Sequence, residues 1–353
     1  MTIVESLAIP IVGAPMAGGA STPELAAAVS DAGGLGFLAA GYLTPDTVRE
    51  QIAAVRSLTT RPFGVNLFVP GDQAADQAAL GRYRDRLEAE AALYGAELGV
   101  PVADDDAWAA KLALVAEAEV PVVSFTFGTP DRETVARLKE HGSEVVVTVT
   151  SAVEARLAAD AGADALCVQG PEAGGHRGTF VNPDHVDDVA LLPLLHRVSS
   201  AVSQPLIAAG GLSRGRDVAA VLVAGARAAQ LGTVYLTCPE SGAHPLHKAA
   251  LTDGSYPGTA VTRAFTGRPA RGMVNRFMLD HSADAPAAYP QVHQLTRGLR
   301  AAAARSGDAA AMSLWAGQGH PFAREVPAGE LTRQLAADAR AALADAARRL
   351  TDA

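Results

Sequence analysis

The chain has 353 residues, which is room for one large domain or two ordinary ones with a substantial buried core. Its formal net charge is −9 and no stretch is dense in Lys and Arg, which argues against nucleic acid as a partner. The N-terminus lacks the basic region of a signal peptide, and no run approaches the roughly 18 apolar residues of a membrane span. Cys167 and Cys238 are too few for a disulfide framework, so the sequence predicts a cytoplasmic protein without membrane contact.

Short apolar runs alternate with Ala-rich helical stretches along the chain. The runs are apolar throughout, which fits a parallel sheet covered on both faces. Hydroxyl residues in Ser21-Thr22, at Thr44, at Thr129 and in Thr150-Ser151 are expected to cap the helices that follow them. Eight βα units in roughly 240 residues predict an α/β fold of the TIM (β/α)8 barrel type rather than an open doubly wound sheet. The eight runs are 11–15, 35–39, 63–68, 121–126, 144–149, 165–170, 205–210 and 228–233.

Two long segments interrupt this alternation, each after the C-terminal end of a predicted strand. Residues 71–106 include a charged inserted helix, and residues 237–313 mix helical stretches with a basic loop. Because the C-terminal strand ends form the active-site face of a TIM barrel, we expect the two segments to pack together as a mainly helical lid domain. The barrel would then comprise 1–70, 107–236 and 314–353. Its last part is an amphipathic helix from about Ala328, expected to close the barrel wall through Leu331, Leu335, Ala339, Leu343 and Leu350.

The stretch GLGFLA at 34–39 matches the G-x-G-x-x-A form of a dinucleotide-binding fingerprint. That fingerprint requires a strand before it and a helix after it. Here a helix ends before Gly33 and the strand itself contains the motif. The sequence therefore favours a helix C-cap at Gly33 or Gly34.

The stretch GLSRG at 211–215 matches the nucleophile elbow of serine hydrolases, with a strand before it and a helix after it. In a TIM barrel, however, the loops after strands seven and eight commonly bind phosphate, and bare N–H groups at a helix N-terminus suit an anion. We favour a phosphate site at Gly211 over two alternatives, a tight turn without a ligand and a hydrolase that uses Ser213. The hydrolase stays open because acids and histidines follow, among them Asp280, His281, His293 and His320.

The residues after position 237 include a cysteine and two histidines that could be interpreted as a metal site. Cys238, His244 and His247 fit no standard zinc spacing, and Pro239 and Pro245 interrupt any helix that would align them. We expect loop residues that open the lid, and no metal.

Three side-chain amides stand near predicted strand ends. Asn66 lies in the third run, Gln169 near the end of the sixth and Gln230 in the eighth. An amide both donates and accepts hydrogen bonds. Three of them at one barrel mouth suit the edge of a flavin pyrimidine ring.

His176 follows the sixth run in QGPEAGGHRG (169–178), with glycines on both sides. A lone loop histidine usually does no more than hydrogen-bond to the backbone. Its place above the same barrel mouth as the amides favours a functional role. Glu172 and Arg177 are expected to orient the loop or face solvent.

Together these stretches resemble the nitronate monooxygenase family, formerly called 2-nitropropane dioxygenases, which are FMN-dependent TIM-barrel enzymes with a helical second domain. The similarity spans nearly the whole chain and extends to flavin-dependent enoyl-acyl-carrier-protein reductases and NADH:quinone reductases. His320-Pro321 departs from the small residues that the family often has there. The similar stretches are GAPMAG (13–18), PFGVNLF (62–68), QGPEAGGHRG (169–178), AAGGLSRGRDVAAVLVAGARAAQLGT (208–233), TGRPAR (266–271) and LWAGQG (314–319).

The resemblance implies an FMN cofactor and His176 as the catalytic base. In that interpretation the neutral imidazole removes the proton from the carbon that bears the nitro group. A nitronate or nitroalkane then reacts with dioxygen through the flavin to give a carbonyl compound and nitrite. Met16 and Phe68 are expected to line a small cavity. The implied cofactor contacts are Met16, Asn66, Gln169, Gly174, Gly211, Gln230, Leu231, Gly232 and Thr233.

The main alternative is an NAD(P)H-dependent flavin reductase of the same fold, because its nucleotide contacts would come from lid loops that the sequence does not place. A non-enzymatic flavin-binding barrel is a further alternative, weakened by His176. The sequence leaves open the physiological substrate, the acceptance of neutral nitroalkanes, and whether the chain forms a homo-oligomer.

Overall fold

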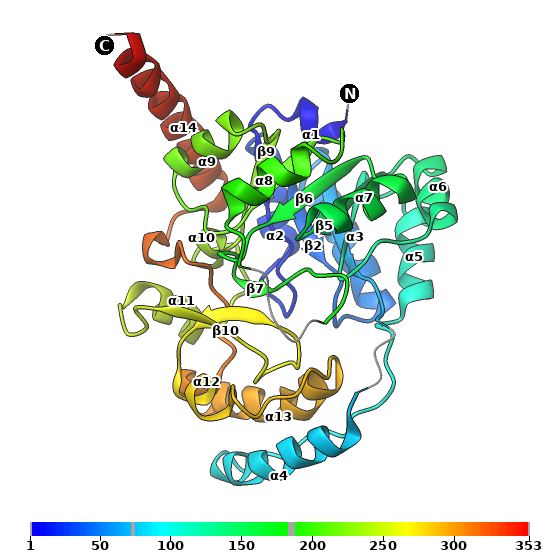
Figure 1. Cartoon of the computed structure of the whole chain (residues 1–353), viewed down its shortest axis with the longest axis vertical. Helices are drawn as coiled ribbons and strands as arrows, with labels where there is room; N and C mark the ends of the chain where they lie inside the picture. The colour runs from blue at the N-terminus through cyan, green and yellow to red at the C-terminus, as the bar shows by residue number, and fades with distance from the viewer. Residues whose placement is uncertain (1, 72–74, 183–187, 352–353) are drawn as a thin grey trace.

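The computed structural model describes residues 2–71, 75–182 and 188–351. Eight parallel strands follow one another in the order β1-β9-β8-β6-β5-β4-β3-β2, and a parallel bridge from Val12 to Leu35 joins β1 to β2. This arrangement confirms the predicted TIM-barrel fold (Figure 1). The strands are β1 Ile11–Gly13, β2 Gly36–Ala39, β3 Phe63–Phe68, β4 Val122–Thr126, β5 Glu144–Val149, β6 Ala165–Gln169, β8 Leu206–Ala209 and β9 Ala228–Leu231.

The barrel strands are buried on both faces, which explains why their sequences are apolar throughout. One set of side chains fills the barrel interior, among them Val12, Phe37 and Ile207. Val4 of the short helix α1 (Ile3–Ser6) joins this cluster and covers one end of the barrel. The other face of each strand packs beneath the surrounding helices.

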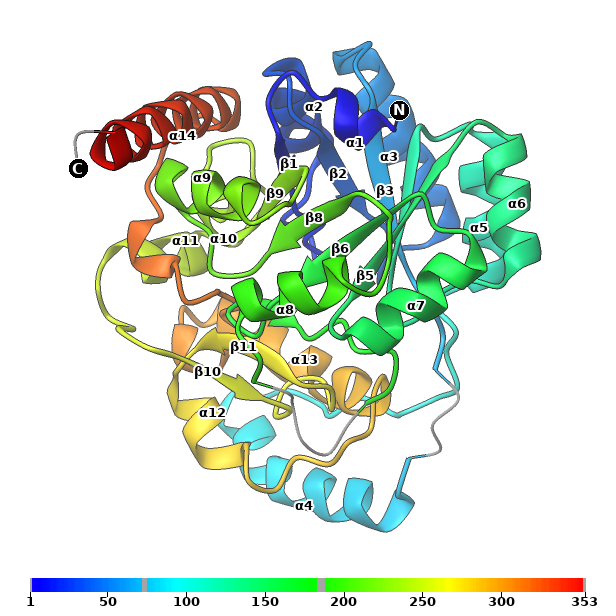
Figure 2. The same ribbon diagram turned by 45° about the horizontal axis from the view of Figure 1, so that its top comes forward.

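Most of the predicted caps begin the outer helices. Thr22, Thr44 and Ser151 each accept a backbone N–H of the first helical turn. The expectation at Thr129 was wrong: Asp131 caps that helix, since its carboxylate accepts the N–H of Thr134 at 2.7 Å. The helices around the barrel are α2 Pro23–Asp31, α3 Pro45–Leu58, α5 Trp108–Glu117, α6 Arg132–Glu140, α7 Ala152–Ala161, α8 Leu191–Ser199 and α9 Gly215–Val223 (Figure 2).

The last helix, α14 (Ala328–Thr351), covers the barrel along only part of its length. Leu331, Leu335 and Ala339 are buried against α9 and α2. Leu343 and Leu350 are exposed, and the helix extends beyond the body of the protein (Figure 1). The expectation that all five residues close the wall therefore holds only for the first half of the helix.

A buried cation ties the loop after β2 to helix α5. The Lys111 ammonium is 2.8 Å from the Asp106 carboxylate and donates to the carbonyl of Ala40 at 2.9 Å. The Lys111 residue is 1% exposed. The same carboxylate accepts the backbone N–H of Tyr42 at 2.9 Å, so this ion pair fixes the position of Tyr42.

The two inserted segments pack together over the barrel. Helix α4 (Gln77–Leu93) shares a core with α12 (Arg276–His281) and α13 (Gln291–Arg305), centred on Tyr83, Phe277 and Leu295. Figure 2 shows these helices beside one end of the barrel. We propose that the barrel and lid ranges expected from the sequence are two separate domains. The separate core of the lid helices supports this division. Residues 1, 72–74, 183–187 and 352–353 of those ranges lie outside the described residues.

A small antiparallel sheet, not predicted from the sequence, joins the two units. Its order is β10 (Thr259–Thr262), β11 (Ala270–Met273) and β7 (Gly175–His176). β7 comes from the loop after barrel strand β6, so the sheet holds that loop against the second unit. Short helices α10 (Thr233–Leu236) and α11 (Pro245–Thr252) lead into the second inserted segment. Among the residues that the structure describes, no helix is both long and apolar enough to cross a membrane.

Candidate active site

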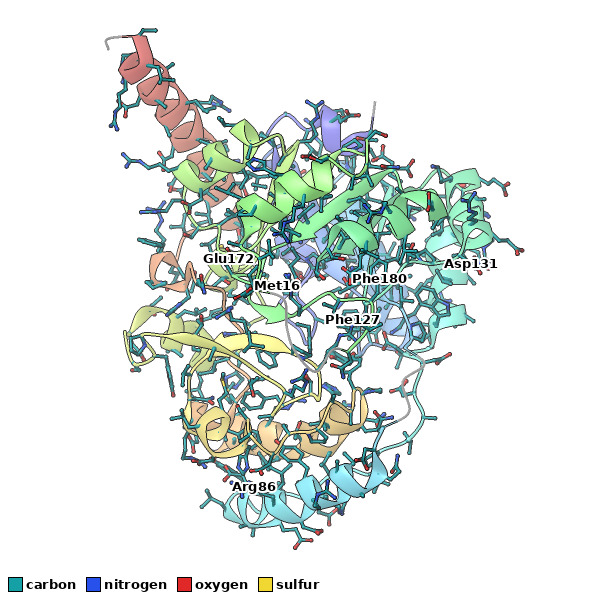
Figure 3. The ribbon with its side chains drawn as sticks, in the orientation of Figure 1. Met16, Arg86, Phe127, Asp131, Glu172 and Phe180 are labelled. Carbon is teal, nitrogen blue, oxygen red and sulfur yellow. The ribbon has the colours of Figure 1, made fainter. Side chains whose placement is uncertain are left out.

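A cavity of about 360 Å³ lies at the C-terminal ends of the barrel strands. Strand-end residues form one part of its lining, and Thr266, His293 and Arg300 of the second unit form another. Figure 3 shows Met16 and Phe127 in the zone where the two units meet. The volume falls within the usual range for a small-molecule site, and the position is that of TIM-barrel active sites.

Nine of the ten residues named from the sequence line this cavity. Leu231 is the tenth: its side chain is 1% exposed and belongs to the core around the barrel. Phe68, expected to line a small cavity, also lines it. The nine are Met16, Asn66, Gln169, Gly174, His176, Gly211, Gln230, Gly232 and Thr233.

The three amides differ in what they bind. Asn66 donates to the hydroxyls of Ser124 and Thr126, at 2.9 and 3.1 Å. Gln169 donates to the carbonyl of His176 at 3.0 Å and accepts the N–H of Gly178 at 2.8 Å. Gln169 therefore holds the histidine loop, a task that its strand-end position did not reveal. The amide of Gln230 has no hydrogen-bond partner among the described residues and is free for a ligand.

Two glycine-containing loops form a cradle for an anion. Gly210 and Gly211 have φ values of 128° and 69°, in the left-handed region that favours glycine. The backbone N–H groups of Gly211, Leu212, Gly232 and Thr233 all belong to cavity-lining residues and have no acceptor among the described residues. Free backbone N–H groups on two loops that line one cavity are donors that an anion such as phosphate can use.

The structure does not support the hydrolase. The Ser213 hydroxyl donates to Asp217 at 3.1 Å, as part of the turn that starts α9, and Ser213 does not line the cavity. Nor does any group of three or more His, Cys, Asp or Glu in the described ranges have the arrangement of a metal site. The Cys238 thiol instead donates to the carbonyl of Val234.

His176 sits on β7, beside the barrel mouth. Its Nε2 is 2.9 Å from the Thr266 hydroxyl oxygen, and that hydroxyl lies 3.3 Å from the Arg268 carbonyl, its acceptor. When the hydroxyl donates its one proton to the Arg268 carbonyl, it accepts from Nε2–H; a hydroxyl that donates to Nε2 requires the other tautomer. In the first arrangement the unprotonated nitrogen of His176 is Nδ1, which has no partner among the described residues.

The surroundings of His176 keep its ring neutral. Aromatic rings of Phe127, Tyr289 and Trp315 lie at centroid distances of 5.7, 5.8 and 5.7 Å. Burial, followed by the charges of Arg268 and Arg300, lowers the pKa of His176 to about 3. At neutral pH the imidazole is therefore uncharged, and one of its ring nitrogens can accept a proton.

Two arginines that have no carboxylate partner among the described residues make the site electropositive. Arg268 donates to the carbonyl of Thr179 and lies over the Phe127 ring, 4.0 Å from its centroid. Arg300 lines the cavity and donates to the hydroxyls of Thr296 and Ser313, at 3.2 and 3.3 Å. Burial lowers the pKa of both arginines to about 10, so both remain charged at neutral pH. An anionic ligand would compensate these charges.

Sequence reasoning missed several residues around His176. Tyr42 and Phe127 have φ values of 68° and 78°, which are unusual for non-glycine residues and concentrate at functional sites. Nothing in the sequence signals these conformations. His293 and Arg300 lie on one helix at a spacing of seven, which places both on one face and was available as a signal.

Stability is expected to fall as the pH is lowered from 7 to 5. Burial is the largest cause that lowers the pKa of His176 to about 3, of His247 to about 4 and of His293 to about 2. The unfolded chain therefore binds protons below about pH 6.5 that the folded chain does not, and each histidine contributes a slope of up to about 1.4 kcal/mol per pH unit. Urea unfolding at pH 7, 6 and 5 measures this. A stability that is constant or rises toward pH 5 would contradict these neutral imidazoles.

Comparison with known proteins identifies relatives over most of the chain. The sequence model of a family described as nitronate monooxygenase matches residues 2–338. A probable nitronate monooxygenase of Staphylococcus aureus is 38% identical over 340 residues, covering 95% of each chain. The structure of a nitroalkane oxidase from Streptomyces ansochromogenes is 53% identical, with a TM-score of 0.95, over 97% of this chain and 99% of that one. FabK from Thermotoga maritima is 29% identical, with a TM-score of 0.77, over 99% of both chains.

Proposed function

The chain belongs to the nitronate monooxygenase family of oxidoreductases, and from this premise we propose that it oxidises small alkyl nitronates and nitroalkanes with FMN and dioxygen. The products would be a carbonyl compound and nitrite. The observation that carries the proposal is a cavity lined by the neutral imidazoles of His176 and His293 and by Arg300, with Arg268 packed on the lining residue Phe127. A nitronate is a small anion, and these charges favour it over a neutral molecule of the same shape.

Residues at the barrel mouth would hold the FMN. The N–H groups of Gly211, Leu212, Gly232 and Thr233 would bind its phosphate, and the free amide of Gln230 would reach a polar edge of the flavin. When bound, the flavin supplies the electron transfer from the substrate to dioxygen. Asn66 lines the cavity, and its amide is oriented by the hydroxyls of Ser124 and Thr126. Met16 and Gly174 would contribute to the shape of the binding site.

His176 would act on the carbon that bears the nitro group. With Nε2–H donated to Thr266, its Nδ1 is free to take a proton from the α-carbon of a neutral nitroalkane. The proton and the negative charge separate within the cavity, and Arg300 stabilises the nitronate that forms. A substrate supplied as the nitronate needs no such step. His176 would then serve mainly to shape the site.

An NAD(P)H-dependent flavin reductase of the same fold is the second candidate. The similarity to FabK over nearly the full chain favours keeping it. The two candidates differ in what reduces the flavin.

Anaerobic mixing separates them. We expect the purified protein to be yellow, to release FMN on denaturation, and to lose its flavin absorbance on mixing with ethyl nitronate, with oxygen uptake and nitrite release in air. NADH and NADPH alone should reduce the flavin at least about 100-fold more slowly. Rapid reduction by NADH with none by the nitronate would establish the reductase instead, and a colourless protein without flavin would contradict both.

A further inference from the structure

His293 and Arg300 form a hydrogen-bonded unit on one face of α13. Both residues line the cavity. An Arg300 Nη nitrogen is 3.2 Å from His293 Nδ1 and also donates to the carbonyl of His293 at 3.4 Å. The other guanidinium nitrogens donate to Thr296 and Ser313, so the arginine is held in place from two further sides.

This contact determines which nitrogen of His293 carries the proton. A guanidinium donates hydrogen bonds and accepts none. His293 Nδ1 must therefore be the unprotonated acceptor, and the single ring proton lies on Nε2. Nε2–H has no acceptor among the described residues, although His293 lines the cavity.

The ring of His293 is also fixed in orientation. Tyr42 stacks on it with a centroid distance of 4.1 Å and an interplanar angle of 4°. Tyr42 is itself held by the Asp106 carboxylate at its backbone and by the Tyr289 hydroxyl, 3.1 Å from its own. A donor so constrained loses little conformational entropy when it binds a ligand.

The positive charges of Arg300 and Arg297 act on His293. Burial comes first among the causes that lower its pKa, followed by Arg300, His176 and Arg297. Tyr42, which stacks on the ring, is a further titratable group beside it. The imidazole stays neutral, and the Arg300 hydrogen bond at Nδ1 polarises it and strengthens Nε2–H as a donor.

We propose that His293 is an oxyanion-binding residue, whose Nε2–H donates to a negatively charged oxygen of the substrate while Arg300 fixes its tautomer. The ligand class is a small planar oxyanion. This deepens the proposed function, because it assigns a residue to the nitro oxygens of a nitronate. It also gives His293 a different task from His176: His293 donates a hydrogen bond from Nε2–H, whereas His176 offers the lone pair of Nδ1.

Nitrate binding to the flavin-loaded protein tests this without turnover. Nitrate is a planar oxyanion that cannot be oxidised further, and its Kd is measured by calorimetry and by the change in flavin absorbance. In His293→Phe, which keeps an aromatic ring against Tyr42, we expect the Kd to rise about 10- to 100-fold, as for loss of a hydrogen bond to a charge. His293→Gln retains an N–H donor of similar reach and should stay within about threefold of the wild type.

His281→Phe is the matched control. His281 lies in the same unit, packs on Phe277, and neither ring nitrogen has a hydrogen-bond partner among the described residues. It does not line the cavity. Its Kd for nitrate should equal that of the wild type. Equal Kd values in His293→Phe and the wild type, or no nitrate binding by the wild type, would overturn the proposal.

The tautomer of His293 can also be observed directly in the wild-type protein, so this test does not depend on whether a variant folds. Imidazole ¹⁵N NMR of the labelled wild-type holoenzyme should show His293 as neutral with Nε2–H between pH 5 and 8, and a proton on Nδ1 would refute the assignment. The outcome is separable from the proposed function. A protein that binds nitrate through His293 but leaves ethyl nitronate unreacted would retain the oxyanion site and exclude the nitronate reaction.

Discussion

Replacing His176 with asparagine is expected to leave flavin binding intact and to lower kcat/KM for a neutral nitroalkane about 10²- to 10⁴-fold, the usual contribution of a general base. The asparagine amide can form hydrogen bonds near the position of Nδ1 but cannot take up the α-proton. The Nδ1 nitrogen of His293 does not replace it, because that nitrogen accepts from Arg300.

Comparison of two substrates isolates the proton transfer. The His176→Asn variant should lose far less activity with ethyl nitronate, which already lacks the proton, than with nitroethane. Flavin content and the thermal midpoint serve as controls for folding. Equal losses with both substrates would assign His176 to binding, and unchanged turnover with nitroethane would remove it from the reaction.

The acid side of the pH profile carries the same information. A base must be unprotonated to act, and the pKa of His176 in the free protein is lowered to about 3 by burial and the arginines. The plot of kcat/KM for nitroethane should therefore show no loss due to His176 between pH 8 and 5, since kcat/KM reports ionisations of the free enzyme. An ordinary histidine would lose activity below about pH 6.5.

The barrel was predictable because its strands are buried on both faces. EVVVTV at 144–149 and FGVNLF at 63–68 contain too few polar residues for any exposed strand face, and the structure has strands at both ranges. The second unit was predicted as mainly helical; its strands β10 and β11, which form a sheet with β7 of the barrel unit, were not predicted. β7 has two residues and exists because β11 pairs with it, so no local pattern reveals it.

The candidate site, like the fold, was predictable from the sequence only in part. Strand-end residues such as Gln169 and Gln230 reach the cavity because the barrel geometry brings every C-terminal strand end to one mouth. The partners of these side chains are set by tertiary contacts: Gln169 binds the histidine loop, and Gln230 has no hydrogen-bond partner in the part of the chain that the structure describes. Tyr42 depends on a positive φ and on Asp106, which is 64 residues away, so its place beside His293 was not visible in the sequence.

Lys111→Met is expected to destabilise the fold by about 3 kcal/mol, the lower end of the cost of breaking a buried ion pair. The substitution removes the donors to Ala40 and Asp106 and leaves a carboxylate whose surroundings raise its pKa through burial, against the opposing effect of Lys111. The Asp106 side chain is 23% exposed, so solvent limits the cost. Urea unfolding at pH 7 measures the loss.

Lys139→Met supplies the matched comparison. Lys139 is 2.7 Å from Asp164, a distance close to that of the Lys111 pair, but its side chain is 43% exposed, and such pairs contribute about 0–1 kcal/mol. Adding Asp106→Asn to Lys111→Met should recover part of the lost stability, because no unpaired carboxylate then remains. Since Asp106 holds the backbone of Tyr42, both Lys111 variants should also weaken nitrate binding through the loosened His293 ring. If Lys111→Met and Lys139→Met unfold at the same urea concentration, burial does not govern the contribution of the Lys111 ion pair.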